Sequence, residues 1–298
     1  MTFHIGTHSY DLDGGWGRVG PEYEFNWVSG LAVDLNDNVY VFNLATHDLM
    51  IFDREGELLR IWPHWYENAH GIRLDAHKNL YIVDRDAHCV MKYSSDGDLI
   101  LELGTRGQYS DSGYSLEEGR RTNWVNPVER AAGPFNVPSG VAVNDRGDIF
   151  VSDGYANCRV HKFDAEGQLV MSWGVPGKVK PGEFHLVHGI VLDDRGRIIA
   201  CDRQNDRLQV FTQEGEFVAV WDGLSKPSSV AVGPNGVITV AELEGRVSHL
   251  DSDGQILARW NRGDGGFVMP HGVAVDSRGD IYVGDVSTSQ RIKKFVRI

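Results

Sequence analysis

The sequence has little cysteine, no long apolar run and too few basic residues to balance its acidic ones. Its 298 residues include only Cys89, Cys158 and Cys201, which lie far apart in strand-like segments. An odd number without close spacing argues against a disulfide framework and against a cysteine-type zinc site. It is typical of buried free thiols in a reducing compartment. No stretch of about 18 apolar residues occurs, so no membrane-spanning helix is expected.

Charge and the first residues narrow the class of protein further. Lys and Arg number 29 against 42 Asp and Glu, which gives a formal net charge of −13. Nucleic acids and anionic membranes attract clustered Lys and Arg, so neither is an expected partner. Residues 1–6 lack the basic start and apolar core of a signal peptide. We therefore expect a cytoplasmic protein.

The chain is rich in a repeated unit of short strand-like runs separated by Asp/Gly turns. Each unit begins at an anchor, and the anchors are Gly30, Gly71, Gly140, Gly189, Ser229 and Gly272. They are spaced by 41, 69, 49, 40 and 43 residues, which is the period of a propeller blade apart from one insertion. In the third unit the four runs are 140–143, 148–151, 159–164 and 169–173. No segment shows a helical 3.6-residue period, so the predicted fold is all-β, a six-bladed β-propeller forming a single domain over residues 1–298.

The two ends of the chain fit one blade. The last unit lacks its fourth strand after residues 292–297, whereas Phe3–Tyr10 precede the first anchor and have no place in the first unit. A propeller must protect the edges of its sheets. We therefore expect the N-terminal residues to pair onto the last blade and close the ring.

Residues 105–136 form the insertion and show no strand pattern. They contain aromatic and basic residues, namely Tyr109, Tyr114, Trp124, Phe135, Arg106, Arg120, Arg121 and Arg130. Long irregular segments in compact folds are commonly functional. A lid over one face and a loop packed on the rim are both compatible with this composition.

The residue before each anchor alternates between Ser and His along the chain. The histidines are His70, His188 and His271, from blades two, four and six. In a six-bladed ring these blades are about 120° apart, so three imidazoles would converge at one height. Such a set suits zinc or another divalent transition metal and leaves a direction open for water or substrate. The alternative is that the histidines only hydrogen-bond to trapped water.

Tyr155 and Arg203 come just after the second strands of their units. The ends of these strands should reach the same face of the propeller as the three histidines. The Asp that recurs at these strand ends, as at Asp84 and Asp153, is expected to accept backbone N–H bonds in the turn. By themselves Tyr155 and Arg203 are more typical of rim contacts than of catalysis.

Several motifs resemble one family. Residues 152–159 (Ser-Asp-Gly-Tyr-Ala-Asn-Cys-Arg), 181–184 (Pro-Gly-Glu-Phe), 202–205 (Asp-Arg-Gln-Asn) and 269–271 (Met-Pro-His) are similar to those of the peptidyl-α-hydroxyglycine α-amidating lyases. The anchors themselves resemble NHL-type propeller repeats in general. The resemblance runs through all six units.

The resemblance implies a site and a reaction. His70, His188 and His271 would bind catalytic zinc, Tyr155 would act as the base, Arg203 would support it, and Met269 would line the pocket. The family reaction converts R–CO–NH–CH(OH)–COO⁻ into an amide and glyoxylate. Because free tyrosine has a pKa of about 10, a phenolate base near neutrality requires neighbouring positive charge.

Two positions depart from the family pattern. Leu44 stands where the family has a substrate-contacting arginine, and Gly272 stands where animal members have a calcium-binding carboxylate. A leucine cannot pair with a substrate carboxylate. We therefore expect no calcium and a substrate that differs from the family's, contacted by Met269, Leu44 and Arg85.

The sequence thus predicts a metal-dependent lyase that breaks the carbon–nitrogen bond of a small α-hydroxylated amide. A hydrolase or hydratase that uses metal-bound water at the same three histidines is one alternative. A non-catalytic NHL propeller that binds a protein partner is the other. The oligomeric state does not follow from the sequence.

Overall fold

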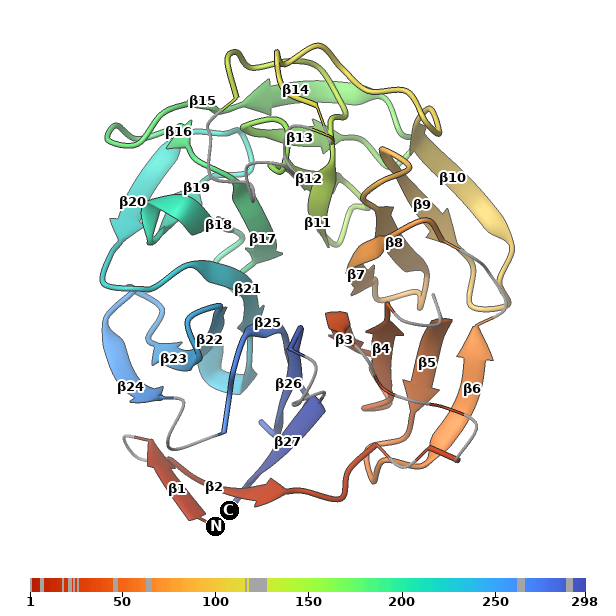
Figure 1. The fold of residues 1–298 in the computed structure, drawn as a ribbon, viewed down its shortest axis with the longest axis vertical. Coiled ribbons are helices and arrows are strands. Elements are labelled where there is room, and N and C mark those ends of the chain that lie inside the picture. The colour runs from red at the N-terminus through yellow and green to blue at the C-terminus, as the bar shows by residue number, and fades with distance from the viewer. Residues whose placement is uncertain are drawn as a thin grey trace. The chain divides into compact units, whose positions relative to one another are not determined.

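In the computed structural model, the regular secondary structure of the described residues is almost entirely β-strand (Figure 1). The structure describes residues 2–5, 8–17, 19–20, 23, 25, 27–44, 48–62, 66–115, 117, 128–261, 266–287 and 292–298. Five sheets have four strands, and a sixth has five strands. Since one sheet follows each sequence repeat, the fold class is the predicted six-bladed β-propeller.

Helix is nearly absent from the described residues, as the missing helical period predicts. The 3-10 helices η1 (Arg203–Asn205) and η2 (Pro234–Gly236) are single turns. No helix in the described ranges is long and apolar enough to cross a lipid bilayer.

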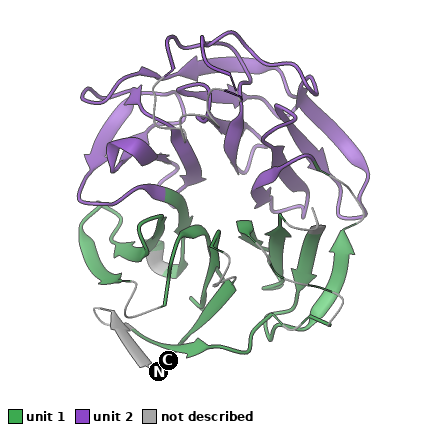
Figure 2. Ribbon diagram, in the orientation of Figure 1, with its two compact units in different colours: residues 1–66, 228–298 green, residues 67–227 purple. Residues whose placement is uncertain are grey.

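The chain divides into two compact units, residues 1–66 with 228–298 and residues 67–227 (Figure 2). We call them unit 1 and unit 2 and describe each by itself. The expectation of a single domain stays a prediction.

Unit 2 contains three four-stranded sheets. The first is built from β7 (Ala69–Leu74), β8 (Leu80–Asp84), β9 (Cys89–Tyr93) and β10 (Leu99–Gly104). The second is built from β11 (Pro138–Val143), β12 (Ile149–Asp153), β13 (Arg159–Phe163) and β14 (Leu169–Trp173). The third is built from β17 (Val187–Leu192), β18 (Ile198–Asp202), β19 (Arg207–Phe211) and β20 (Phe217–Trp221), and the short strands β15 (Val175–Pro176) and β16 (Glu183–Phe184) pair separately. The four runs predicted for the third repeat match β11–β14 within two residues at each end.

Unit 1 contains the other three sheets. One is built from β3 (Val28–Val33), β4 (Val39–Asn43), β5 (Asp48–Phe52) and β6 (Leu58–Trp62). Another is built from β21 (Pro227–Val232), β22 (Ile238–Glu242), β23 (Arg246–Leu250) and β24 (Ile256–Trp260). The last holds β25 (Pro270–Val275), β26 (Ile281–Asp285) and β27 (Ile292–Arg297), followed by β2 (His8–Asp13) and β1 (Thr2–Ile5).

The predicted N-terminal closure is confirmed in that last sheet. β2 pairs antiparallel with β27, with Tyr10 opposite Arg297, and β1 pairs with β2. The Tyr10 ring is buried edge-on against Trp260, with ring centroids 5.2 Å apart. This strand addition covers an edge that β27 would otherwise expose.

Apolar side chains fill the space between neighbouring sheets of each unit. In unit 2 one cluster joins Phe150 and Val160 of one sheet to Ile198 and Phe211 of the next. Strand alternation explains this pattern, because the two faces of each blade meet the two adjacent blades. The polar residues at the strand ends are therefore held on rigid supports.

Candidate metal and catalytic site

Two histidines from the repeat anchors, His70 and His188, lie together in unit 2. His70 is on β7 and His188 is on β17, and β11 packs against both of these strands. Both side chains are buried. Their ring centroids are 4.7 Å apart, and their ligand nitrogens lie within 4.8 Å of each other.

A β-bulge turns each of these histidines out of its strand pairing. The register of β7 against β8 shifts between Ala69 and Gly71, so His70 is the extra residue. The register of β17 shifts in the same way between Val187 and Ile190. Bulges re-aim side chains and are frequent beside functional sites.

The phenol of Tyr155 meets both imidazoles. Its hydroxyl oxygen lies 3.1 Å from Nε2 of His70 and 2.8 Å from Nε2 of His188. The ring is buried against Val137 and Leu186. The structure therefore brings together three residues that are 85 and 33 positions apart in the sequence.

Two guanidinium groups flank the Tyr155 ring. The Arg203 Cζ lies 5.1 Å from the ring centroid, and its Nη1 donates to the phenol oxygen at 3.2 Å. The Arg85 Cζ lies 4.9 Å from the same centroid, and its Nε donates to Asp86 Oδ1 at 2.8 Å. Burial lowers the pKa of Arg85, but the neighbouring Tyr155 and Asp86 outweigh it and raise that pKa above its ordinary value. Arg85 was predicted only as a substrate contact, and its place beside Tyr155 was missed.

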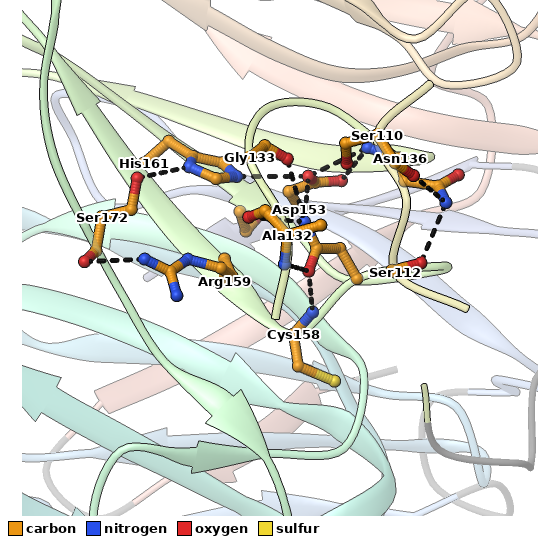
Figure 3. A network of polar contacts seen from close by, with 12 residues as sticks. Ser110, Ser112, Ala132, Gly133, Asn136, Asp153, Cys158, Arg159, His161 and Ser172 are labelled. Atoms are coloured by element: carbon orange, nitrogen blue, oxygen red, sulfur yellow. Dashed lines mark hydrogen bonds and ion pairs between the residues drawn. The ribbon is translucent and has the colours of Figure 1, made fainter. Parts of the chain in front are cut away.

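The turn that carries Tyr155 is fixed by a buried carboxylate (Figure 3). Asp153 accepts bonds from the backbone N–H of Asn136 at 3.0 Å and from Asn157 Nδ2 at 2.9 Å. Nε2 of His161 lies 3.2 Å from the same carboxylate, and its Nδ1 lies 2.7 Å from Ser172 Oγ. Nothing in the repeat position of His161 distinguishes it from other histidines in the sequence.

The strand-end aspartates are structural, as predicted. Asp84 accepts the backbone N–H groups of Glu67 and Asn68 at 2.9 Å each, and Asp202 accepts that of His185 at 2.8 Å. These bonds hold the segment that precedes each first strand against the end of the second strand.

The described part of the insertion is tied to the same turn. Asn136 Nδ2 donates to the carbonyls of Ser110 at 3.0 Å and Tyr114 at 2.8 Å, and Ser112 Oγ donates to the carbonyl of Ala156. These contacts pack the described residues of the insertion onto the turn, and the lid over one face stays a prediction. Three residues of the insertion named above lie outside the described residues, namely Trp124, Arg120 and Arg121.

The remaining predicted site residues belong to unit 1. His271 is buried on β25, and its Nδ1 lies 2.8 Å from the carbonyl oxygen of Ser29. Met269 is 42% exposed, and its backbone N–H donates to Asp285. Leu44 is half-buried directly after β4.

The unit 2 residues are chemically suited to a divalent cation. His70 donates its Nδ1–H to a carbonyl oxygen 2.7 Å away, so a neutral ring presents the Nε2 lone pair toward Tyr155. Neutral imidazole nitrogens are ligands that zinc and similar ions bind.

Comparisons with known proteins agree with the repeat pattern. The NHL repeat model matches residues 135–163 and 267–295. Human NHL repeat-containing protein 3 is 31% identical over 313 residues, which cover 96% of this chain and 84% of the relative.

A second relative and a solved structure extend the comparison. Peptidyl-alpha-hydroxyglycine alpha-amidating lyase 1 of Drosophila melanogaster is 31% identical over 191 residues, covering 54% of this chain and 35% of that protein. The structure of a streptogramin B lyase superposes with a TM-score of 0.65 at 13% identity, over 99% of this chain and 100% of the other. At that identity the likeness shows the fold alone. The chain belongs to the NHL-repeat family that includes human NHL repeat-containing protein 3, and its relatives include peptidyl-α-hydroxyglycine α-amidating lyases.

Proposed function

We propose that the protein is a metal-dependent lyase that cleaves the carbon–nitrogen bond of a small α-hydroxylated amide. One observation carries the proposal. The Tyr155 hydroxyl lies within hydrogen-bond distance of Nε2 of His70 and of His188, with the Arg203 guanidinium at 3.2 Å. A buried base beside a pair of ligand nitrogens and a fixed cation is suited to removing a proton from a substrate hydroxyl.

His70, His188 and His271 would together hold the ion, zinc or another divalent transition metal. His271 is included because it occupies the same repeat position and because its Nδ1 also faces a carbonyl oxygen, at 2.8 Å. A bound ion of this kind lowers the pKa of a hydroxyl that binds to it. No calcium is part of the proposal.

The protein's own residues perform the proton transfers. Tyr155, as a phenolate, takes the proton of the substrate hydroxyl, and the positive charges of Arg203 and Arg85 stabilise the phenolate. As the C–O bond becomes a carbonyl, the electron pair of the C–N bond leaves with the amide nitrogen. Tyr155 returns the proton to that nitrogen, so the products are an amide and an aldehyde, with no net change in protons.

The substrate would contact Met269, Leu44 and Arg85. Leu44 offers apolar surface, so the substrate would differ from a peptidyl-hydroxyglycine on that side. Since Cys89, Cys158 and Cys201 are buried and form no disulfide among the described residues, we propose that the protein works in the reducing cytosol.

The test measures bound metal and glyoxylate in the same samples. Metal-loaded protein is incubated with α-hydroxyhippurate. Tyr155→Phe should lower the rate at least about a hundredfold, the usual contribution of a general base. A similar aromatic change at the exposed Tyr109, Tyr109→Phe, should leave the rate unchanged.

Each negative result has a distinct meaning. Metal binding without glyoxylate would exclude α-hydroxyhippurate and point to another substrate, in line with Leu44, or to a hydrolase or hydratase at the same site. Wild-type protein free of metal would contradict both enzymes and favour a propeller that binds a protein partner.

A further inference from the structure

The serines that alternate with the histidines make contacts that the sequence does not explain. In unit 2, His70 Nδ1 lies 2.7 Å from the carbonyl oxygen of Ser139, the residue at the same position of the next repeat. In unit 1, His271 Nδ1 lies 2.8 Å from the carbonyl oxygen of Ser29, again at that position. A carbonyl only accepts, so Nδ1 carries a hydrogen in both rings, and in the neutral form of each ring Nε2 keeps its lone pair.

The Ser139 carbonyl accepts from the preceding repeat, whereas its hydroxyl contacts the repeat that follows. Ser139 Oγ lies 2.8 Å from the carbonyl oxygen of His188 and 3.0 Å from that of Val187. Ser152 Oγ donates to the same His188 carbonyl at 2.6 Å. Both hydroxyls are buried and cannot reach water as an alternative partner.

Unit 1 repeats this second contact independently. Ser228 Oγ donates to the carbonyl oxygen of Pro270 at 3.1 Å, and Pro270 directly precedes His271. In unit 1, therefore, Ser29 accepts from the His271 ring and Ser228 donates to the backbone beside the same histidine. In unit 2 the two contacts involve two different histidines, His70 and His188. Ser139 makes both of these contacts.

We propose that these serines are positioning residues for the ligand histidines, and that Ser139 couples His70 to His188. Its carbonyl fixes which nitrogen of His70 is protonated, while its hydroxyl fixes the backbone from which His188 projects. The inference rests on the proposed metal site and not on the lyase reaction. It accounts for a serine in the repeats that precede His188 and His271, because any residue offers a backbone carbonyl but only a hydroxyl can donate to the backbone at those positions.

A purely structural role is the competing explanation, since a hydroxyl that joins two blades could stabilise the fold alone. The two roles differ in what they predict for metal affinity. Groups that orient metal-bound histidines typically change the affinity by about ten- to a hundredfold when they are removed. A hydroxyl that only joins strands changes the stability and leaves the affinity as it was.

The experiment therefore uses Zn²⁺ affinity, from competition with a chromophoric chelator, together with the visible spectrum of the Co²⁺ form. Ser139→Ala and Ser152→Ala should each weaken Zn²⁺ binding about tenfold or more and alter the Co²⁺ spectrum. The matched control is Ser248→Ala. Ser248 is also buried, but its hydroxyl donates to a Glu242 carboxylate oxygen. It should lower the thermal midpoint without changing the affinity, and wild-type affinity in both test variants would overturn the proposal.

A second measurement needs neither a variant nor a metal. Long-range ¹H–¹⁵N correlations of metal-free wild-type protein report the tautomer of each ring. We expect His70 and His271 to carry the hydrogen on Nδ1, and hydrogen on Nε2 would overturn the proposal even if Ser139→Ala fails to fold. Should the wild type bind no divalent ion, the proposed function fails, and this measurement still decides whether the serine carbonyls set the tautomers.

Discussion

Gly154 is the position at which one added methyl group should do most harm. It lies between Asp153, the last residue of β12, and Tyr155. A Cβ at this position would lie 1.9 Å from the carbonyl oxygen of Val187 and 2.6 Å from its N and C atoms. Val187 precedes His188, so Gly154→Ala drives the turn with the proposed base against the strand with a proposed ligand.

Neither side of this contact can yield easily. The Asp153 carboxylate holds the turn in place through four contacts. Both of its oxygens accept from the Asn136 N–H, and Oδ2 also contacts Asn157 Nδ2 and His161 Nε2. The other side is strand backbone rather than the end of a flexible side chain. Overpacking costs about 1–3 kcal/mol, and we expect about 3 kcal/mol here because only backbone can move. For 298 residues, with an unfolding entropy of about 2.1 cal/mol/K per residue, that lowers the thermal midpoint by roughly 5 °C.

The effect on catalysis should exceed the effect on stability. The Tyr155 hydroxyl makes contacts of 2.8–3.2 Å that a shift of the turn would break. A displacement of about 1 Å at a reacting group can lower a rate about a hundredfold. Calorimetry and the glyoxylate assay measure the two effects on the same protein.

Gly133→Ala is the matched control, because a Cβ there would meet no atom within 4 Å. It should leave both the midpoint and the rate as in the wild type. A Gly154→Ala protein that unfolds within about 1 °C of the wild type would refute the steric reasoning. A strongly destabilised Gly154→Ala protein with an unchanged rate below its midpoint would refute the link to Tyr155.

Two further predictions concern protonation. Burial lowers the pKa of His88, although three carboxylates oppose the shift, those of Asp84, Asp86 and Asp153. The unfolded chain then binds the proton first, so the free energy of unfolding should fall as the pH drops below about 6.5. His88→Asn keeps an acceptor for the Val137 N–H, which lies 3.0 Å from His88 Nδ1 in the wild type, and asparagine suits the backbone φ of 57°. Urea titrations at pH 7 and pH 5 should show a smaller loss of unfolding free energy in this variant than in the wild type. An equal loss would contradict the assignment to His88. Burial also raises the pKa of Cys89 and of Cys158 to about 12, so iodoacetamide should label them only after unfolding, which intact-mass spectra can follow; rapid labelling of native protein would contradict it.

The blade pattern could be predicted because its causes are local. Strands of five or six residues alternate between two buried faces, and Asp/Gly turns separate them, so β11–β14 follow from residues near one another in the sequence. The pairing of β2 with β27 followed from counting the strands in each repeat. The last repeat was one strand short, and the segment before the first repeat supplied one strand too many. Neither inference needed a contact between specific distant side chains.

The support around Tyr155 could not be predicted, because it depends on such contacts. Asn136 is 17 residues from Asp153 and 26 from Ser110; its backbone N–H donates to Asp153, while its side chain donates to the Ser110 carbonyl of the insertion. Arg85 reaches the Tyr155 ring from another sheet. Nothing periodic marks these residues, and an Asn or Arg in a loop is compatible with full exposure.

The anchor motif lies between these cases, and its register explains why. Strict alternation along β7 would treat His70 as an ordinary member of the strand, yet the pairing shifts between Ala69 and Gly71. A Cβ at Gly71 would lie 2.7 Å from the Ser139 carbonyl oxygen, the same atom that accepts the His70 Nδ1–H. The glycine therefore lets the next strand approach closely enough for its carbonyl to hold the imidazole. A His-Gly pair opposite a Ser-Gly pair follows from one requirement, which is close approach of the two backbones at a bulge. The sequence shows these residues but does not show the bulge that brings them together.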